Sequence, residues 1–187
     1  MEKNMKLHLG CGWRDFGDEW VHIDGGDYDH LNHYDITKLP YKDESVDLIY
    51  ASHVLEYFDR DEVVPVLREW IRVLKKGGIL RIAVPDFEAI ATMYIMTRST
   101  PTHYRLGSFL GPLYGKMKMG DQTIYHKTTY DFSDLSLMLK ALGISSVRRY
   151  DWRKTEHAEF DDHSQAYIPH MEKEKGTLIS LNIEGIK

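Results

Sequence analysis

Short apolar runs bounded by turn residues recur along the first half of the chain and again near its end. Such runs predict β-strands. The runs at 46–51 and 79–84 show little polar alternation, which is typical of strands covered on both faces of a parallel sheet. The tail instead alternates apolar and polar positions, which favours an antiparallel or edge strand. We expect seven strands, at 5–9, 20–23, 34–36, 46–51, 79–84, 147–150 and 177–184.

Apolar residues at helical spacing predict the clearest helix of the chain over 63–74. We expect Asp59 or Asp61 to cap its start, because a carboxylate accepts hydrogen bonds from the free N–H groups of the first turn. Lys75 and Lys76 suit the negative end of the helix dipole, and Gly77 suits the left-handed stop.

Two further helices are expected, over 87–96 with Asp86 as cap and over 133–142 with Ser133 as cap. A strand, a helix and a strand with short connections form a right-handed βαβ unit. The pattern therefore predicts one α/β domain over 1–187, with a doubly wound, Rossmann-like and mostly parallel sheet whose last strand is antiparallel. Glycines and prolines at 98–127 indicate a loop-rich insertion with a short helix at most.

Charge and composition narrow the function. The net charge of -5 and the pI of about 6.0 argue against general electrostatic binding of nucleic acid. No apolar run approaches the roughly 20 residues that a membrane span needs. The first residues lack the apolar core of a signal peptide, so we expect a cytoplasmic protein without a membrane partner. Cys11 is the one cysteine, which excludes an internal disulfide.

Ligands of such a sheet bind beyond the carboxyl ends of the strands, so the residues there are the candidates for a binding site. Gly10 and Gly12 follow the first strand and allow a tight turn close to a ligand. Asp24 follows the second strand and can accept both hydroxyls of a ribose. Acidic residues at 15, 18 and 19 would repel a pyrophosphate, whereas they suit a sulfonium cation. The stretch 111–117 also departs from the spacing of a phosphate-binding loop.

Four stretches together resemble the class I S-adenosylmethionine-dependent methyltransferases. They are LHLGCG at 7–12, VHID at 21–24, YDITKLPYKDESVDLIYASHVLEYF at 34–58 and REWIRVLKKGGILRIAVPD at 68–86. The tail is similar to small predicted methyltransferases, some of them glycan-associated. The resemblance implies transfer of a methyl group from S-adenosylmethionine, with S-adenosylhomocysteine as product, to a small-molecule or glycan acceptor.

The resemblance also implies roles for individual residues. Gly10, Cys11 and Gly12 correspond to the loop beside the methionine part of the cofactor, and Asp24 to the ribose acceptor with Gly25 after it.

The adenine side corresponds to Asp35 and Ile36, with the acid facing the exocyclic amine. Ser52 and His53 correspond to residues beneath the reacting sulfur.

The first loop departs from the family pattern. His8 stands where an acid is usual, and Arg14 stands where a third glycine is usual. Only 14 residues separate Gly10 from Asp24, so we expect the first helix to be cut to about one turn. The short loop would then either weaken cofactor binding or leave a later loop or a partner subunit to complete the site.

Histidine is the natural base near neutral pH. His53 is the first catalytic candidate because it follows the fourth expected strand, and a hydrogen bond to the next helix is its alternative role. His126 is the second candidate, with a surface-loop position as its alternative. Glu56, Tyr57 and Asp86 could orient an acceptor, although Asp86 fits a helix cap better.

Two polar clusters could bind a metal. They are Asp161, Asp162 and His163 before the last strand, and the histidines and aspartates of 27–35. A charged run such as 161–163 is usually an exposed loop, and no helix fixes the spacing of the 27–35 cluster, so we expect no metal at either. The 161–163 loop could also cover the acceptor site.

Other functions remain open at this point. The irregular first loop favours, as the main alternative, an inactive cofactor-binding module or a subunit of a larger enzyme; a homodimer is one possible assembly. An aminopropyl transferase would need an acidic polyamine site, which 34–58 does not indicate. A base methyltransferase lacks its expected motif at 51–54.

Overall fold

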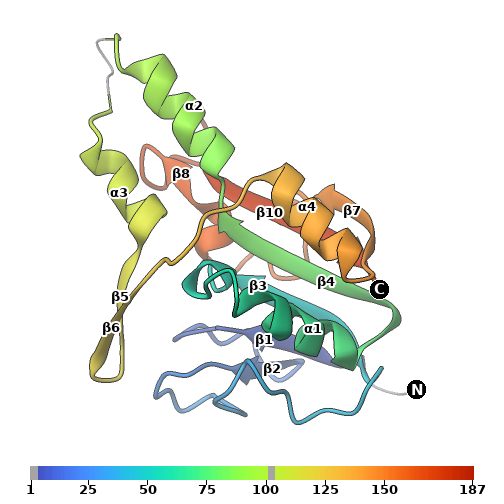
Figure 1. Cartoon of the computed structure of the whole chain (residues 1–187). Helices are drawn as coiled ribbons and strands as arrows, with labels where there is room; N and C mark the ends of the chain where they lie inside the picture. Colours follow the sequence, from blue (N-terminus) through green and yellow to red (C-terminus); the bar gives the residue numbers. More distant parts are fainter. Residues whose placement is uncertain (1–3, 101–103) are drawn as a thin grey trace.

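The computed structural model describes residues 4–100 and 104–187. A central sheet has the order β2-β1-β3-β4-β10-β7 (Figure 1). Its first four strands run parallel, and β10 pairs antiparallel with both β4 and β7. The strands of this sheet are β1 (Lys6–Leu9), β2 (Trp20–Ile23), β3 (Val46–Ser52), β4 (Leu74–Pro85), β7 (Ser145–Arg149) and β10 (Ser180–Ile186).

The mostly parallel sheet with antiparallel last strands is confirmed, but it has six strands and not seven. The expected strand at 34–36 is absent, and the segment meets the sheet through one isolated bridge between Ile23 and His33. The reason is that Tyr34 and Asp35 are exposed, so the segment buries too little apolar surface to join the sheet. The expected last strand is interrupted: β9 (Thr177–Leu178) pairs with β8 (Tyr167–Ile168), and β10 follows it.

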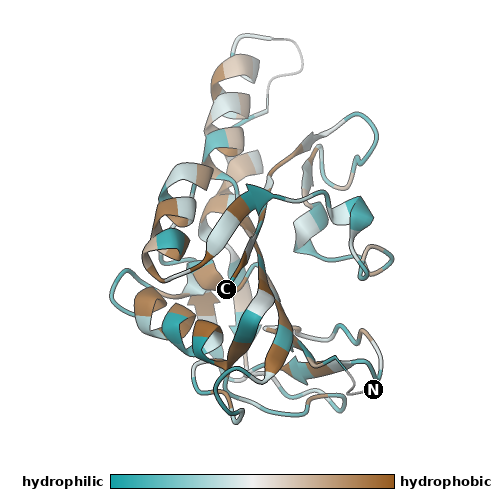
Figure 2. Ribbon diagram, turned by 90° about the vertical axis from the view of Figure 1, so that its right-hand side faces the viewer, coloured by the Kyte–Doolittle hydropathy of each residue, from teal (hydrophilic) through white to brown (hydrophobic). Residues whose placement is uncertain are grey.

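Helices α1 (Val63–Val73) and α4 (Phe132–Ala141) cover one face of the sheet (Figure 1). Leu67 and Trp70 of α1 and Leu135 of α4 belong to one buried core with the strand residues that point to this side. The central strands are accordingly apolar along much of their length (Figure 2). The cap of α4 is Asp131, which accepts from the backbone N–H of Asp134 at 2.8 Å, so the expected cap Ser133 was wrong.

The ends of α1 are stabilised by charged groups. Asp59 Oδ1 accepts from the backbone N–H of Glu62 at 3.0 Å, and Glu62 Oε2 accepts from that of Asp59 at 2.9 Å, which is a reciprocal capping arrangement. At the other end, Lys187 Nζ donates to the carbonyls of Ile71 and Leu74 at 2.7 and 2.8 Å.

The expectation that Lys75, Lys76 and Gly77 end α1 was wrong in its details. Lys75 instead pairs with Asp47 at 2.9 Å. Gly77 has a left-handed φ of 81°, but it lies inside β4, where the pairing with β3 shifts register. The chain turns into β4 directly after α1, because Leu74 already has extended backbone.

The opposite face of the sheet has no helix between β1 and β2, so the expected one-turn helix was wrong. The ten residues 10–19 form turns there. A stack of rings covers this face instead, formed by His8, Phe16, Tyr50, His157 and Phe160, with centroid separations of 4.0 Å for His8–Phe16, 3.9 Å for Tyr50–His157 and 4.4 Å for Phe16–Phe160. Residues 157 and 160 come from the segment that carries η2 (Trp152–Lys154) and η3 (His163–Gln165).

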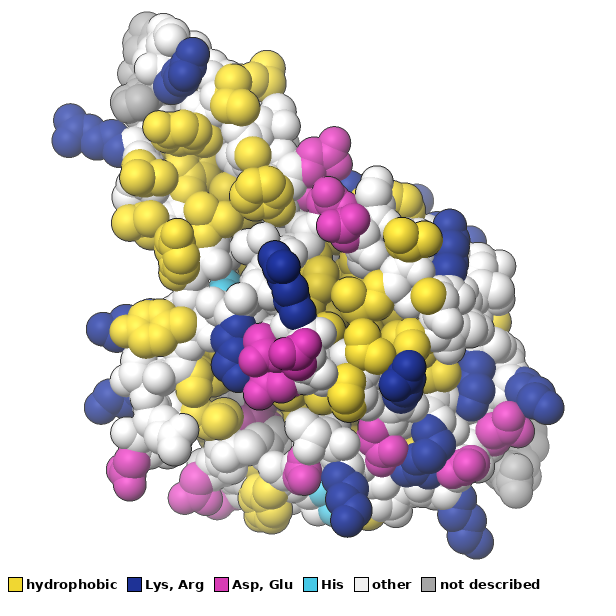
Figure 3. Space-filling model, viewed as in Figure 1, with side chains coloured by type: hydrophobic (Ala, Val, Ile, Leu, Met, Phe, Trp, Pro, Cys, Tyr) yellow, Lys and Arg dark blue, Asp and Glu magenta, His cyan; other side chains and the backbone are white. Residues whose placement is uncertain are grey.

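The insertion forms an arm that projects from the sheet (Figure 1). The arm begins with α2 (Phe87–Thr97), and the insertion adds α3 (Gly107–Tyr114) and a hairpin of β5 (Lys116–Met119) and β6 (Gln122–Tyr125). Asp86 caps α2 as expected, accepting from Ala89 N at 3.3 Å. The helix α3 agrees with the expected short helix, whereas the hairpin was not expected. Apolar side chains gather on the arm (Figure 3), among them exposed Ile95, Met96, Leu106 and Tyr114.

Across 4–100 and 104–187, no helix is both long enough and apolar enough to cross a membrane. The expected cytoplasmic location stays a prediction.

The ring stack makes stability depend on acidity. Burial lowers the pKa of His157 to about 4, and its Nε2 has no hydrogen-bond partner. The unfolded chain binds a proton at this histidine below about pH 6.5, whereas the folded chain does not until about pH 4. The free energy of unfolding should therefore fall between pH 6.5 and 4, by on the order of 3 kcal/mol from this residue.

Urea unfolding at several pH values checks this. His157→Phe keeps the stacking and should reduce the fall in the free energy of unfolding by this amount. His170→Gln, at an exposed position, is the control and should follow the wild type. An unchanged acid dependence in His157→Phe would contradict a buried neutral ring.

Candidate functional site

A cavity of about 1640 Å³ opens beyond the carboxyl ends of β1, β2 and β3. Parallel strands end at the same edge of a sheet, so the turns that follow them meet there. The β5–β6 hairpin and the segment 162–171 form further walls. The cavity is thus built from three strand ends, the insertion and the ring-bearing segment near the C-terminus.

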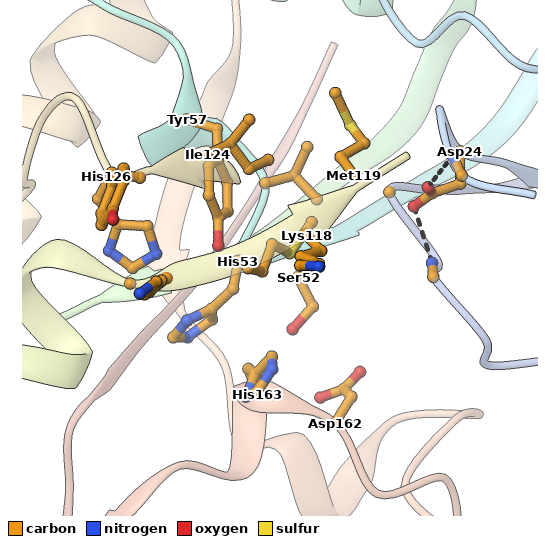
Figure 4. Close-up of a pocket in the computed structure, with 18 of the residues that line it drawn as sticks. Asp24, Ser52, His53, Tyr57, Lys118, Met119, Ile124, His126, Asp162 and His163 are labelled. Carbon is orange, nitrogen blue, oxygen red and sulfur yellow. Dashed lines mark hydrogen bonds between the residues drawn. The ribbon is translucent and has the colours of Figure 1, made fainter. Parts of the chain in front are cut away.

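Asp24 joins the two turns at the sheet edge. Its Oδ2 accepts from Gly12 N at 2.8 Å and its Oδ1 accepts from Gly26 N at 2.7 Å (Figure 4). The residue is 9% exposed and lines the cavity. Each carboxylate oxygen can accept more than one hydrogen bond, so the group can also receive hydroxyl donors from a ligand.

Glycine is required at the first turn. Gly10 has a φ of 65°, and a Cβ there would lie 2.1 Å from a methyl carbon of Val54. Gly12 has a φ of 58°, and a Cβ added there would meet no atom within 4 Å, so its backbone is open to a ligand. Both glycines line the cavity.

Cys11 does not line the cavity with its neighbours. Its side chain is buried behind the turn, with Sγ 3.7 Å from His30 Nε2, and burial raises the pKa of the thiol to about 12. Cys11 therefore contributes backbone to the loop and a packed, unreactive thiol.

The turn at 34–37 forms another wall. Asp35 Oδ1 accepts from the backbone N–H and the hydroxyl of Thr37 at 2.8 and 2.6 Å, and the hydroxyl bond lowers the pKa of Asp35. The carbonyl of Ile36 accepts from Trp70 Nε1 at 2.8 Å, which ties the turn to α1. Asp35 and Ile36 both line the cavity, and so does Gly25, where a Cβ would lie 3.3 Å from Met119 Sδ.

Ser52 and His53 stand at the end of β3 and line the cavity. Ser52 Oγ is buried without a hydrogen-bond partner. His53 has a left-handed φ of 54°, while its backbone N–H donates to the carbonyl of Ala83 at 2.8 Å. A side chain held in this uncommon conformation is typical of functional positions.

Three histidines and one carboxyl gather beyond Ser52, and we call His53, Glu56, His126 and His163 the histidine cluster (Figure 4 labels its three histidines). Glu56 follows in η1 (Leu55–Tyr57) and is fully buried. Its Oε1 lies 3.4 Å from His53 Nδ1 and 3.6 Å from His126 Nε2. Burial raises the pKa of Glu56 to about 8 and lowers the pKa values of His53 and His126.

The insertion positions His126 where the arm returns to the domain. Lys127 N donates to the carbonyl of Glu56 at 2.8 Å, and Lys127 Nζ pairs with Glu62 at 2.7 Å. The His126 ring packs edge-on to Tyr57, with centroids 4.8 Å apart. A Cβ on Gly115 would lie 2.1 Å from His126 Nε2, so only a glycine lets the ring approach this backbone.

Two parts of the site have only weak signals in the sequence. The first is Asp162 and His163, which line the cavity because Tyr50 OH donates to Asp162 Oδ2 at 2.5 Å and Arg14 Nε donates to the carbonyl of Asp161 at 2.8 Å. The polar run at 161–163 was the available signal; we favoured an exposed loop over a loop that covers the acceptor site, and the structure places Asp162 and His163 in the cavity wall.

The second part is the hairpin, whose residues Lys118, Met119 and Ile124 also line the cavity (Figure 4). No periodic pattern in 98–127 distinguished them from loop residues.

Neither of the two polar clusters considered as metal sites, at 161–163 and 27–35, is arranged to hold a metal ion. In the part of the chain that the structure describes, no group of three or more histidine, cysteine, aspartate or glutamate side chains is arranged to hold a metal ion.

Comparisons with known proteins agree on the fold. The model of a family described as "Methyltransferase domain" matches residues 19–82. A search of curated proteins found no match. A SAM-dependent methyltransferase from Archaeoglobus fulgidus is similar in structure, with 16% identity, a TM-score of 0.57 and coverage of 100% of this chain and 87% of that one.

Two further solved structures share the fold. A SAM-dependent methyltransferase from Thermotoga maritima has 15% identity, a TM-score of 0.56 and coverage of 100% and 84%. The 1,6-didemethyltoxoflavin-N1-methyltransferase of Burkholderia thailandensis, solved with 1,6-didemethyltoxoflavin and S-adenosylhomocysteine, has 12% identity, a TM-score of 0.53 and coverage of 98% and 70%.

The packing of His126 against Gly115 can be tested by Gly115→Ala. The added methyl group overlaps the ring, and φ at this position is positive, at 34°. We expect a loss of roughly 1–3 kcal/mol in the free energy of unfolding, measured in urea. Gly111→Ala in α3 is the matched control, because its Cβ would meet no atom within 4 Å. That variant should be neutral or up to about 1 kcal/mol more stable. Equal stability of the two variants would contradict the close approach.

Proposed function

We propose that this chain is a class I S-adenosylmethionine-dependent methyltransferase that methylates a small-molecule or glycan acceptor in the strand-end cavity, as its matched domain and its fold support. The observation that carries the proposal is Asp24, a nearly buried carboxylate aimed into that cavity and held by the backbone of two turns.

The residues at the sheet edge fit the cofactor. Asp24 would accept the ribose hydroxyls, and the open backbone of Gly12 leaves room beside it for the methionine part. Asp35 and Ile36 would flank the adenine, because the second oxygen of Asp35 is not used by Thr37. When bound, S-adenosylmethionine supplies an electrophilic methyl group on a positively charged sulfur.

The remaining wall of the nucleoside site would come from the insertion. Met119 of the hairpin lies next to Gly25, directly after Asp24. This placement supports the expectation that a later loop completes a site whose own first loop is short.

Space for an acceptor supports transfer to a separate molecule. Pockets for drug-sized ligands usually have volumes of about 300–1000 Å³. The cavity here, at about 1640 Å³, has room for a second molecule beyond the cofactor. The similar Burkholderia enzyme was solved with 1,6-didemethyltoxoflavin and S-adenosylhomocysteine bound, which supports a small acceptor here.

For methyl transfer the protein mainly has to align the acceptor with the methyl group and to remove a proton from the acceptor. The histidine cluster lies next to Ser52, at the side of the cavity away from Asp24 in Figure 4. The sequence predicted His53 and His126 as the catalytic residues; both belong to this cluster together with His163, and Tyr57 lies beside His126, where it would orient an acceptor.

The first loop also favours a second candidate function. Because it contains no helix, the cofactor site depends on the hairpin, and a partner could be needed to hold that hairpin in place. The alternative is a cofactor-binding module or subunit without its own activity. The net charge of -5 gives no support to a nucleic-acid acceptor, and the homodimer stays a prediction.

The role of Asp24 can be tested by calorimetry with S-adenosylhomocysteine. Asp24→Asn removes the charge that the ribose hydroxyls would meet, and hydrogen bonds to charged groups contribute about 1.5–3 kcal/mol. We expect the Kd to rise roughly 10- to 150-fold. Asp29→Asn, at an exposed position in the same loop and outside the cavity wall, is the matched control and should bind as the wild type does.

Wild-type protein that fails to bind S-adenosylhomocysteine at millimolar concentration would contradict the proposal. Tight binding with no transfer from S-adenosylmethionine to any phenol, thiol, amine or sugar acceptor would favour the inactive module.

A further inference from the structure

The network beyond His53 fixes which of its ring nitrogens carries the proton. Asn182 Nδ2 donates to the carbonyl of Ser164 at 2.8 Å, so the side-chain oxygen of Asn182 faces Ser180. Ser180 Oγ donates its one proton to that oxygen at 3.0 Å. The Ser180 oxygen can then only accept from His53 Nε2, 3.1 Å away. His53 therefore carries its hydrogen on Nε2.

The other nitrogen of His53 then presents a lone pair to Glu56. Its Nδ1 lies 3.4 Å from Glu56 Oε1, and an ionised carboxylate would repel that lone pair. Either Glu56 holds a proton or the ring is a cation. Burial lowers the pKa of His53 well below its ordinary range, and His163, His126 and Arg14 lower it further.

Glu56 is built to keep its proton. The carboxyl is fully buried, neither of its oxygens accepts a hydrogen bond that would stabilise its charged form, and burial raises its pKa to about 8. The titratable groups facing it are His53, His126, Tyr57 and Tyr130. None of the four is a lysine or arginine that would hold a carboxylate in its charged form, so the neutral pair is the stable one near pH 7.

His53 consequently has no free ring nitrogen for an acceptor, and the other two rings of the cluster differ in access. Only 6% of the His126 side chain is exposed; its Nδ1 is buried and its Nε2 faces Gly115 and Glu56.

His163 is exposed, lines the cavity and lies with its ring centroid 5.1 Å from that of His53. Among residues 4–100 and 104–187, nothing forms a hydrogen bond with its ring.

We infer that Glu56 is a protonated positioning residue that locks His53 in its Nε2–H tautomer, which leaves the exposed ring of His163 to accept the proton of the methyl acceptor. The role of His163 toward an acceptor rests on the proposed function, whereas the pairing of Glu56 with His53 stands without it. As the bond from the acceptor atom to the methyl carbon forms and the carbon–sulfur bond breaks, the acceptor's proton passes to a His163 ring nitrogen and then to water.

The charged groups around His163 are consistent with its role as the proton acceptor. Arg14, His170, Asp161 and Asp162 face it, and desolvation lowers its pKa, so the ring is neutral and able to accept a proton near pH 7. Asp162 itself is engaged by Tyr50 OH and by Ser164 N at 2.5 and 2.8 Å.

Long-range ¹⁵N NMR of the histidine rings tests the inference on the protein without cofactor. We expect His53 to stay in the Nε2–H form from pH 6 to 8 and His163 to titrate reversibly below its ordinary pKa of about 6.5. Glu56→Gln should keep the His53 tautomer, because an amide can donate to Nδ1 as the protonated carboxyl does. Glu56→Leu removes the donor to Nδ1 and Ser180→Ala removes the acceptor for Nε2, so the double variant should mix the two tautomers.

The pH dependence of unfolding provides a second measurement. The carboxyl of Glu56 has an ordinary pKa of 4.5 and a folded-state pKa of about 8, so its proton favours the folded state below this window and that advantage is lost as the pH rises through it. The ratio of the folding constants of Glu56→Gln and wild type should rise by up to about tenfold per pH unit between pH 5 and 8 and then level off. Glu174→Gln, at an exposed position, should show a constant ratio.

A His53 that titrates near neutral pH, an Nδ1–H tautomer, or a flat ratio for Glu56→Gln would overturn the inference. None of these measurements uses the cofactor, so they can fail while the calorimetry with S-adenosylhomocysteine succeeds, and the two failures are distinguishable.

Discussion

The short connection between β1 and β2 is the constraint from which most of this structure follows. Parallel neighbours are usually joined by a crossover of about a dozen or more residues that contains a helix. Here ten residues make the connection, and no helix fits. One face of the sheet is left without helical cover, and exposed apolar strand residues there would cost stability. The segment after β7 supplies the cover with His157 and Phe160, which stack on Phe16 and Tyr50.

The segment that covers the sheet in place of a helix also forms part of the site. A segment that packs over β1 and β3 must continue past the carboxyl ends of these strands, where the cavity opens. Tyr50 anchors Asp162, and Arg14 of the short connection anchors the backbone at Asp161. His163 is thereby held at the cavity edge by residues more than a hundred positions earlier in the chain. The absence of a helix between β1 and β2 and the position of His163 thus have the same cause, which is that the segment after β7 covers this face of the sheet.

Local patterns predicted the parts of this protein that are locally determined. The buried run at 46–51, the apolar stripe of α1 and the cap at Asp86 depend on neighbours within a few residues, and all three were found as expected. Asp24 could be singled out because a strand end is itself a local feature.

The strand expected at 34–36 was wrong because Tyr34 and Asp35 face solvent. The cap expected at Ser133 was wrong because Asp131 accepts the hydrogen bond at the start of α4. The placement of His126 could not be predicted, since it depends on a hairpin and on the space left by Gly115. His163 depends on contacts across the sheet.

The charge state of the histidine cluster connects the fold to the chemistry. In the proposed site a sulfonium cofactor would bring a positive charge close to Ser52, and charged imidazolium rings beside it would repel that charge. Burial lowers the pKa values of His53 and His126, and partial desolvation lowers the pKa of the exposed His163, so the rings stay neutral. The same burial keeps Glu56 protonated, which removes the carboxylate that would otherwise draw a proton onto His53. A neutral cluster can accept one proton during the reaction, and it does so most readily at the ring that reaches water, because only there can the new charge be solvated.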